Sequence, residues 1–569
     1  MKKYDTLLTP YAEVLDRTSP WNEYPRTSMV RDSFFSLNGE WDFAVTDGAA
    51  PTEYGKIIVP FPPESVLSGC EKRIPRGSVM HYRRTFTLPK DFMKDRLLLH
   101  FGAVDTVCEL YLNGKPLARH EGGYLPFSID ATEALSSGEN TLTLKVRDDL
   151  SKIYPYGKQR RKRGGMWYTP VSGIWQTVWA ESVPASYIER ISVDTDMESA
   201  TVRVFGGEER KTITVSGESY EFFGDTFTFR PTEAKLWSPE SPYIYDFTLR
   251  SGEDEVRSYF ALREIATAEV YGIPRLTLNG EPYLFNGLLD QGYFPDGIFL
   301  PATSEGYRDD ILTAKSLGFN MIRKHIKVEP EIFYTLCDRL GIVVFQDMVN
   351  NSGYSFILDT ALPTVGLKRF PDNFRHRNKR ARKIFTEHSL ATVEHLNKFP
   401  SVLYYTVFNE GWGQFLADRL YEIIKESAPM RIIDATSGWF LRKNSDVDSR
   451  HVYFKPVRLG KRTARPIVIS EFGGYSHRVK GHLYGSANYG YKLFESASEF
   501  ENAFIALYEK EILPLVGEGI SALVYTQLSD VEDETNGLIT YDRKRVKISK
   551  DKCAALMKRL AEAVKPGKN

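Results

Sequence analysis

The chain has 569 residues, enough for about three or four domains, and its 42% hydrophobic and 26% charged residues are typical of a folded globular protein. Lysine plus arginine and aspartate plus glutamate both number 74, and this neutral balance argues against a dedicated nucleic-acid-binding protein. The sequence contains no apolar run long enough to span a membrane and no recognisable signal peptide, so we expect a cytoplasmic protein. The four cysteines lie far apart, which predicts neither a zinc site nor a disulfide framework.

Residues 1–183 consist of short segments of alternating apolar and polar residues, separated by turn signals. The segments 81–88 and 141–146 alternate cleanly, and Asn-Gly pairs at 38–39 and 113–114 mark turns. This pattern predicts a β-sandwich or jelly roll as the first domain.

One stretch of this domain, KQRRKR at 158–163, breaks the pattern with five basic residues. It is open to three interpretations: a patch for a polyanion or nucleic acid, a solvated loop, or a loop that reaches the catalytic domain and shapes its rim. The neutral balance of the whole chain favours the solvated loop.

Residues 184–266 form a second all-β unit. Its expected strands are 187–193, 200–205, 211–215, 226–229 and 243–249. Short strands at this spacing predict a small immunoglobulin-like β-sandwich. Because it carries no catalytic grouping, we expect it to act as a spacer and packing partner.

From residue 267 to 569 the pattern changes to short apolar strands that alternate with helical segments. The expected strands are 283–289, 320–326, 341–347, 402–409, 431–435, 451–454, 466–470 and 519–527. The expected helices include 304–317, 329–340, 375–398, 414–427 and 549–564. Eight such units in roughly 300 residues predict a closed (β/α)₈ barrel.

Two of these strands end in a glutamate. The apolar run 402–408 stops at Asn409 and Glu410, and the run 466–470 stops at Glu471. Barrel enzymes carry their chemistry at the carboxyl ends of the strands, and these two strands lie about opposite each other across the mouth. We therefore expect two facing carboxylates roughly 5 Å apart, the arrangement that cleaves a glycosidic bond with retention.

Other strand ends also carry polar or aromatic residues, and carboxylates, amides and aromatic rings are the groups that bind a sugar. The aromatic content of 13% fits the same reading, because ring faces stack on pyranose rings. The predicted substrate-binding residues are Asp290, Gln291, Arg323, His325, Asp347, Asn409, Trp412, Trp439, His451, Tyr453 and Gln527.

Alternative readings of these residues remain. A glutamate after a strand is commonly a surface or helix-start residue, and a histidine is commonly a hydrogen-bonded structural group. A metal site made of Asp290, His325, Asp347 and His451 is conceivable, but no HxH or HExxH spacing accompanies it. We expect no metal and no cofactor.

Four motifs in order resemble glycoside hydrolase family 2, the family of β-galactosidases, β-glucuronidases and β-mannosidases. They are LNGEWDF at 37–43 with LYLNG at 110–114, GFNMIRKH at 318–325, FNE at 408–410 and ISEFG at 469–473. The resemblance implies a sugar-binding-type jelly roll, with Glu410 as general acid/base and Glu471 as nucleophile. It further implies that Asn409 bonds the sugar 2-hydroxyl and that Tyr453 tunes Glu471.

Two departures from the family pattern bear on the sugar. The family's glucuronidases read the substrate carboxylate with an Asn-x-Lys motif, and the equivalent residues here are Glu534-Thr535-Asn536. This weighs against a glucuronide, although Lys455 or a base from 158–163 could substitute. Gln527 stands where many members have an aromatic residue. Metals are not carried over from the much longer β-galactosidases.

The resulting hypothesis is a retaining exo-β-glycosidase that acts on a small glycoside by double displacement, with a β-galactoside as the first choice. Other family activities, β-glucuronidase, another uronidase or β-mannosidase, are the alternative. From other classes, a non-catalytic carbohydrate-binding protein and a metal-dependent hydrolase are the rivals. The only partner we expect is the carbohydrate, with neither nucleic acid nor membrane, and a homo-oligomer is left open.

Overall fold

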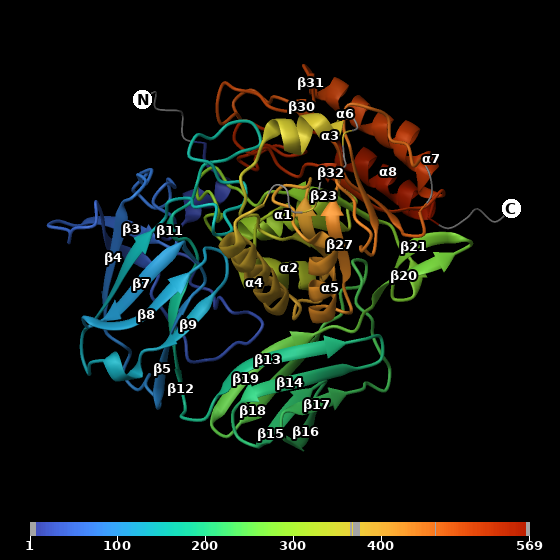
Figure 1. Cartoon of the computed structure of the whole chain (residues 1–569). Helices are drawn as coiled ribbons and strands as arrows, with labels where there is room; N and C mark the ends of the chain where they lie inside the picture. Colours follow the sequence, from blue (N-terminus) through green and yellow to red (C-terminus); the bar gives the residue numbers. More distant parts are fainter. Residues whose placement is uncertain (1–6, 365–366, 368–371, 373–375, 461–462, 565–569) are drawn as a thin grey trace.

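The computed structural model describes residues 7–364, 367, 372, 376–460 and 463–564. The chain folds into two β-sandwiches and a barrel, coloured blue, green and yellow to red in Figure 1. The jelly roll lies to one side of the barrel and the second sandwich lies beneath it. None of the described helices combines the length and apolar character needed to cross a membrane.

The N-terminal domain is a sandwich of a six-stranded and a four-stranded sheet. In spatial order the first contains β3 (Gly55–Val59), β2 (Gly39–Thr46), β4 (Val79–Phe86), β10 (Asn140–Arg147), β7 (Val107–Leu112) and β8 (Lys115–Glu121). The second contains β1 (Phe35–Ser36), β12 (Val178–Val183), β5 (Arg96–Phe101) and β9 (Phe127–Asp130). Along β10 every second residue is buried, so the alternation read from the sequence is the burial pattern of a strand with one solvated face.

The second sandwich packs a three-stranded sheet on a four-stranded one. The first sheet contains β13 (Ile188–Thr195), β14 (Ala200–Gly206) and β17 (Thr226–Phe229). The second contains β16 (Glu218–Phe223), β15 (Arg210–Val215), β18 (Tyr245–Ser251) and β19 (Asp254–Phe260). The five predicted strands are present, and β16 and β19 were not predicted.

All eight predicted barrel strands are present, and they form one parallel sheet. Its order is β27 (Ile432–Ser437), β26 (Val402–Asn409), β25 (Val343–Asp347), β24 (Met321–Lys324), β23 (Phe285–Asp290), β32 (Ile520–Thr526), β29 (Ile467–Gly473) and β28 (Asp448–Val452). β26 is buried along its whole length, as expected for a parallel strand covered on both faces. The predicted fold class is confirmed.

The two end strands of that order, β27 and β28, face each other across a seam without a backbone ladder among the described residues. A side-chain contact spans this seam, because the Ser437 hydroxyl lies 2.8 Å from Nε2 of His451. The position and orientation of His451 are thus set by the neighbouring strand β27 as well as by its own strand, β28.

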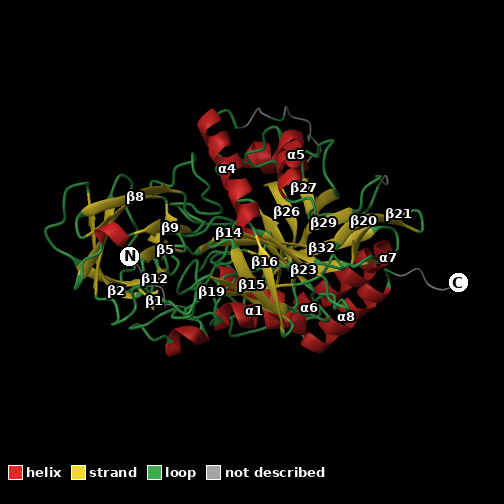
Figure 2. Ribbon diagram, turned by 90° about the horizontal axis from the view of Figure 1, so that it is seen from below, coloured by secondary structure: helices red, strands yellow, loops and turns green. Residues whose placement is uncertain are grey.

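Helices cover the outside of the barrel. Those predicted are found as α1 (Glu305–Ser316), α2 (Glu331–Leu340), α4 (Lys379–Leu396), α5 (Ala417–Ser427) and α8 (Lys550–Glu562), and α6 (Ala497–Leu507) is an addition. Viewed from below, α4 and α5 lie on one side of the strands and α1, α6 and α8 on the other (Figure 2). Part of the predicted helix 375–398 lies outside the described residues.

The inside of the barrel is apolar below and polar above. Stacked rings of Phe345 and Tyr404, with centroids 4.1 Å apart, belong to the lower layer. The hairpin of β20 (Ile265–Val270) and β21 (Ile273–Leu278) contributes Ile265 and Leu278 to the same core. The predicted domain boundary at 266 therefore falls inside β20. The start of the third domain stays a prediction.

Candidate active site

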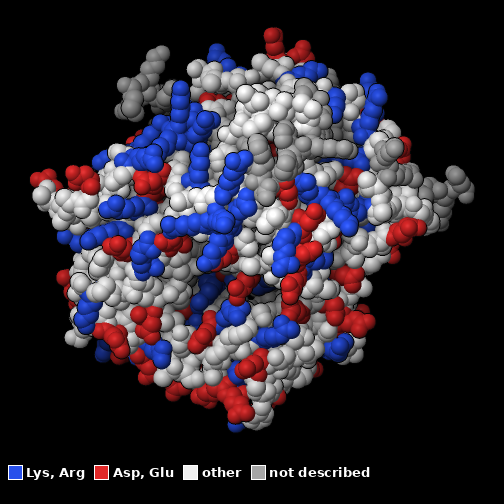
Figure 3. All heavy atoms as spheres, viewed as in Figure 1, with Lys and Arg blue, Asp and Glu red and all other residues white. Residues whose placement is uncertain are grey.

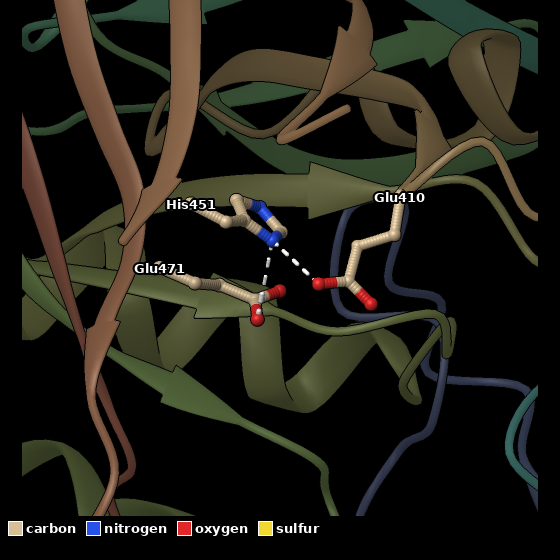
Figure 4. A group of neighbouring side chains, drawn as sticks. All are labelled: Glu410, His451 and Glu471. Atoms are coloured by element: carbon tan, nitrogen blue, oxygen red, sulfur yellow. Dashed lines mark hydrogen bonds and ion pairs between the residues drawn. The ribbon is translucent and has the colours of Figure 1, made fainter. Parts of the chain in front are cut away.

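The first carboxylate of the site stands where β26 ends. Glu410 has a left-handed backbone conformation, with φ of 54°, which is uncommon for a residue other than glycine. Its N–H donates to the Ser437 carbonyl at 2.8 Å, which holds the turn against the neighbouring strand. Gly411 follows with φ of 70°, and a Cβ there would meet the ring of Phe440, so the turn requires glycine. This turn directs the Glu410 side chain into the barrel mouth (Figure 4).

The second carboxylate, that of Glu471, comes from β29 and points toward the first (Figure 4). One carboxylate oxygen of Glu410, one of Glu471 and a ring nitrogen of His451 all lie within 4.8 Å of one another. The side chain of Glu410 is 17% exposed and that of Glu471 only 8%. The two acids therefore share one small opening, and Glu410 is the one that lies closer to solvent.

Positive and hydrogen-bonding groups surround Glu471. The Tyr453 hydroxyl donates to it at 2.7 Å, and the Arg323 guanidinium lies 3.2 Å away. Burial alone would raise the pKa of this carboxyl, but His451, Arg323, His325 and the Tyr453 hydroxyl together hold it below its usual value. Glu471 is thus kept ionised.

Arg323, on β24, connects most of the polar residues in the mouth. Its guanidinium donates to Asp347 at 2.9 Å, to the Ser470 carbonyl at 2.8 Å and to the Asn409 side-chain oxygen at 2.9 Å. The side chain is 1% exposed, and each buried N–H that finds an acceptor avoids a desolvation penalty. Arg323 consequently fixes side chains at the ends of three other strands, β25, β26 and β29.

Two histidines complete this polar layer. His325 lies 2.6 Å from the second oxygen of Asp347, and burial lowers its pKa, so it stays neutral at pH 7. His451 lies 2.9 Å from Glu410 through Nδ1 and 3.5 Å from Glu471. Both occupy the mouth, as the sequence predicts.

The structure does not bring every predicted residue to this opening. The Asp290 carboxylate bonds the buried Lys324, on the helix-facing side of the strands. Alternating side chains explain this, because the neighbouring Leu289 faces the barrel core and Asp290 must then face outward. We withdraw Asp290 from the predicted sugar-binding set.

The remaining predicted residues line the edge of the mouth. Gln291 donates to Gln527 at 3.0 Å, and Gln527 donates to Asn536 at 2.8 Å. The Trp439 ring packs edge-on against His451, with centroids 5.7 Å apart. Trp412 is 3% exposed and donates its indole N–H to the Ser352 carbonyl at 2.7 Å.

A segment of the first domain also reaches the mouth. This jelly-roll loop, residues 156–168, is attached to the barrel where the Tyr156 N–H donates to the Asn350 carbonyl at 2.9 Å. Its Trp167 ring meets that of Trp412, with centroids 5.0 Å apart. Its Tyr168 hydroxyl donates to Glu534, in the loop after β32. Of the three interpretations of the basic stretch, the structure matches the loop that shapes the rim.

Other residues of the site were missed from the sequence. Tyr491 stacks on Tyr453, with centroids 4.0 Å apart, and Thr526 lies 2.8 Å from the Tyr453 hydroxyl. Ser437 positions His451. Tyr491 lies in an irregular loop, where no pattern could have found it, whereas Ser437 and Thr526 end two predicted strands and could have been chosen by that criterion.

Among the described residues, Glu410, His451 and Glu471 are the group whose ligand atoms could close around a cation. The alternative set of Asp290, His325, Asp347 and His451 does not converge, since Asp290 bonds Lys324 and Asp347 bonds Arg323 and His325. The metal alternative considered from the sequence therefore lacks a common centre.

A (β/α)₈ barrel with two facing glutamates at its mouth defines a protein of the glycosidase type. The chain matches the family description "Glycosyl hydrolases family 2, TIM barrel domain" over residues 275–546 and "Glycosyl hydrolase 2 galactose-binding domain-like" over residues 73–174. It belongs to glycoside hydrolase family 2.

Relatives in this family carry different sugar names. A "Beta-galactosidase" of Leuconostoc mesenteroides is 24% identical over 85% of this chain and 48% of its own length. A "Beta-glucuronidase" of Felis catus is 26% identical over 50% of this chain and 50% of its own length. The chain spans about half the length of these curated relatives.

Solved structures match nearly the whole chain. A β-glucuronidase from an uncultured Clostridium sp. has a TM-score of 0.73 at 20% identity, with 95% of this chain and 99% of that one covered. A β-galacturonidase from Eisenbergiella tayi, bound to galacturonate, has a TM-score of 0.68 at 19% identity, with 94% and 99% covered. At these identities the likeness is one of fold.

Proposed function

We propose that this protein is a retaining exo-β-glycosidase that hydrolyses a terminal β-glycosidic bond by double displacement. The observation that carries the proposal is the separation of the two acids, with one oxygen of each within 4.8 Å of the other. Retaining enzymes place their carboxyl groups about 5–5.5 Å apart, whereas inverting enzymes leave roughly 6.5–9.5 Å for a water molecule.

The two acids take different roles because their surroundings differ. Glu471 is ionised and buried beside the Arg323 guanidinium, so it attacks the anomeric carbon and forms a glycosyl ester. Glu410 gives its proton to the departing glycosidic oxygen, and the C–O bond to the leaving group breaks. Glu410 then takes a proton from water, the water oxygen attacks the anomeric carbon, and the ester bond to Glu471 breaks.

The groups around the pair support these steps. The guanidinium of Arg323 can only donate hydrogen bonds, and it donates to the Asn409 side-chain oxygen at 2.9 Å. The Asn409 NH₂ is therefore left as a donor for the sugar 2-hydroxyl. Tyr453 donates to Glu471 at 2.7 Å and holds the nucleophile in place. The jelly-roll loop and the loop after β32 meet at Tyr168 and Glu534 and close one side of the mouth, which supports action on a terminal sugar.

A β-galactoside is the first candidate substrate. Gln527, Asn536 and Glu534 form a hydrogen-bonded group suited to neutral hydroxyls, and no lysine stands in the family's carboxylate-reading motif. A β-uronoside is the second candidate, because Lys158 of the jelly-roll loop places a cation at the same rim.

Two measurements test the reaction class. Proton NMR of the first product should show the β-anomer of the released sugar, and a 2-deoxy-2-fluoro β-glycoside should label Glu471 covalently. Release of the α-anomer would show inversion and end the proposal. A protein that binds the sugars but cleaves no nitrophenyl β-glycoside of a panel including galactoside, glucoside, mannoside, glucuronide and galacturonide would instead be a carbohydrate-binding protein.

A further inference from the structure

We propose that Lys158 recognises an anionic substituent on the terminal sugar, a carboxylate or a sulfate ester. The inference rests on the proposed glycosidase function and adds a specificity-determining residue to it. The barrel motif Glu534-Thr535-Asn536 has no cation that could bind such a substituent. The inference assigns this role to the jelly-roll loop.

The position of Lys158 is set by the backbone of the loop. Its carbonyl accepts the Tyr168 N–H at 3.0 Å, so Lys158 lies beside the residue whose hydroxyl bonds Glu534. The preceding Gly157 has φ of 64° and packs against the Ile326 carbonyl, where a Cβ would come within 2.8 Å. The loop therefore enters the mouth closely packed on the end of β24, next to His325.

The Lys158 ammonium is half-buried and has no carboxylate partner within ion-pair distance among the described residues. Its Nζ lies 5.7 Å from the centroid of the Trp167 ring. A cation in this setting loses part of its hydration without gaining a counter-ion. A ligand that supplies a negative charge would compensate for this loss.

The neighbours of Lys158 add to the positive character of this place. Arg160 lies on the same Trp167 ring, 5.8 Å from its centroid. Burial raises the pKa of Glu534 to about 7, against the opposing effects of the Tyr168 hydroxyl and Lys158. Near and below pH 7 this carboxyl does not neutralise the cation fully. Figure 3 shows Lys and Arg side chains gathered on the face of the molecule where the jelly roll meets the barrel.

The contacts around Lys158 lead to Glu471, the acid that attacks the sugar ring. Lys158 acts electrostatically on both Glu534 and His325, and His325 belongs to the chain of contacts through Asp347 and Arg323 to Glu471. Glu534 also accepts from Gln527 at 3.3 Å, and the preceding Thr526 lies 2.8 Å from the Tyr453 hydroxyl that bonds Glu471. We therefore assign the anionic group held by Lys158 to the ring that Glu471 attacks.

The test compares kcat/KM on nitrophenyl β-galactoside, β-galacturonide, β-glucuronide and 6-sulfo-β-galactoside for the native chain, K158M and K158R. We expect the native chain to cleave at least one charged substrate, and K158M to lose about 10- to 100-fold on that substrate alone, as for a hydrogen bond to a charged group. K158R should recover part of the loss. The substrate that responds distinguishes carboxylate from sulfate.

K162M is the matched control, because Lys162 is an exposed lysine of the same loop outside the proposed contact. Calorimetry of free galacturonate, glucuronate and galactose on the Glu471→Gln variant gives a second readout, with the acids binding more tightly and K158M removing the difference. Cleavage of the neutral galactoside with retention, together with no cleavage of any charged substrate, would overturn this inference and leave the proposed function standing. Equal losses on charged and neutral substrates in K158M would overturn it as well.

Discussion

Nδ1 of His451 lies 2.9 Å from an oxygen of Glu410 and 3.5 Å from an oxygen of Glu471, so one imidazole spans both acids of the site. Nε2 is occupied by the Ser437 hydroxyl at 2.8 Å. Because the Ser437 hydroxyl occupies Nε2, Nδ1 is the ring nitrogen that faces the two carboxylates. The relative position of the two acids is thus set by a residue from a third strand.

Replacement of His451 by glutamine is expected to lower kcat by about 10²-fold on nitrophenyl glycosides, because Glu410 loses the contact that orients it. The circular dichroism spectrum should remain that of the native chain. A change in kcat of less than about threefold would show that the imidazole does not position the acids.

Replacement of Glu471 by glutamine is expected to abolish turnover, with a loss of at least about 10⁴-fold in kcat, because the amide cannot form the glycosyl ester. Thermal unfolding serves as the control for folding. Near-native rates on any aryl β-glycoside would refute the assignment of Glu471 as nucleophile.

Replacement of Glu410 by alanine is expected to cost about 10²- to 10⁴-fold on substrates with poor leaving groups and much less on dinitrophenyl glycosides, which depart without a proton. Azide should restore part of the rate and produce a β-glycosyl azide, because the vacated position admits a small anion. Losses of the same size on good and poor leaving groups would remove Glu410 from the acid role.

Replacement of Tyr453 by phenylalanine is expected to move the acid limb of the kcat/KM profile to higher pH. The Tyr453 hydroxyl stabilises ionised Glu471 and helps keep its pKa below the usual 4.5, so its loss raises that pKa. In the native chain the limb set by Glu471 should lie below pH 4.5. An unchanged limb would show that the hydroxyl does not act on the nucleophile.

Treatment with EDTA is expected to leave the activity unchanged, because the two carboxylates supply the acid and the nucleophile themselves. Rates on a nitrophenyl glycoside before and after dialysis against the chelator check this. A loss that zinc or magnesium restores would point to a cation held by Glu410, His451 and Glu471, and would favour the metal-dependent rival.

Much of the barrel could be predicted because its signals are local. Each buried parallel strand is an apolar run such as 402–408, and each run stops where the chain reaches the mouth. The strand ends therefore selected Glu410 and Glu471 before any contact was known. The same rule misplaced Asp290, since a polar residue at a strand end can face the helices as well as the mouth.

By itself the sequence determined the kinds of domain, the eight barrel strands and the two acids at strand ends, because periodicity and polarity act within a few residues. The strand ends also selected Arg323 and His451 for the mouth, but only the tertiary structure decided how these groups contact the two acids. The imidazole of His451 between them, the guanidinium of Arg323 below them and Lys158 at the rim come from other strands or another domain. Their placement depends on packing between segments far apart in the chain, which no local pattern records.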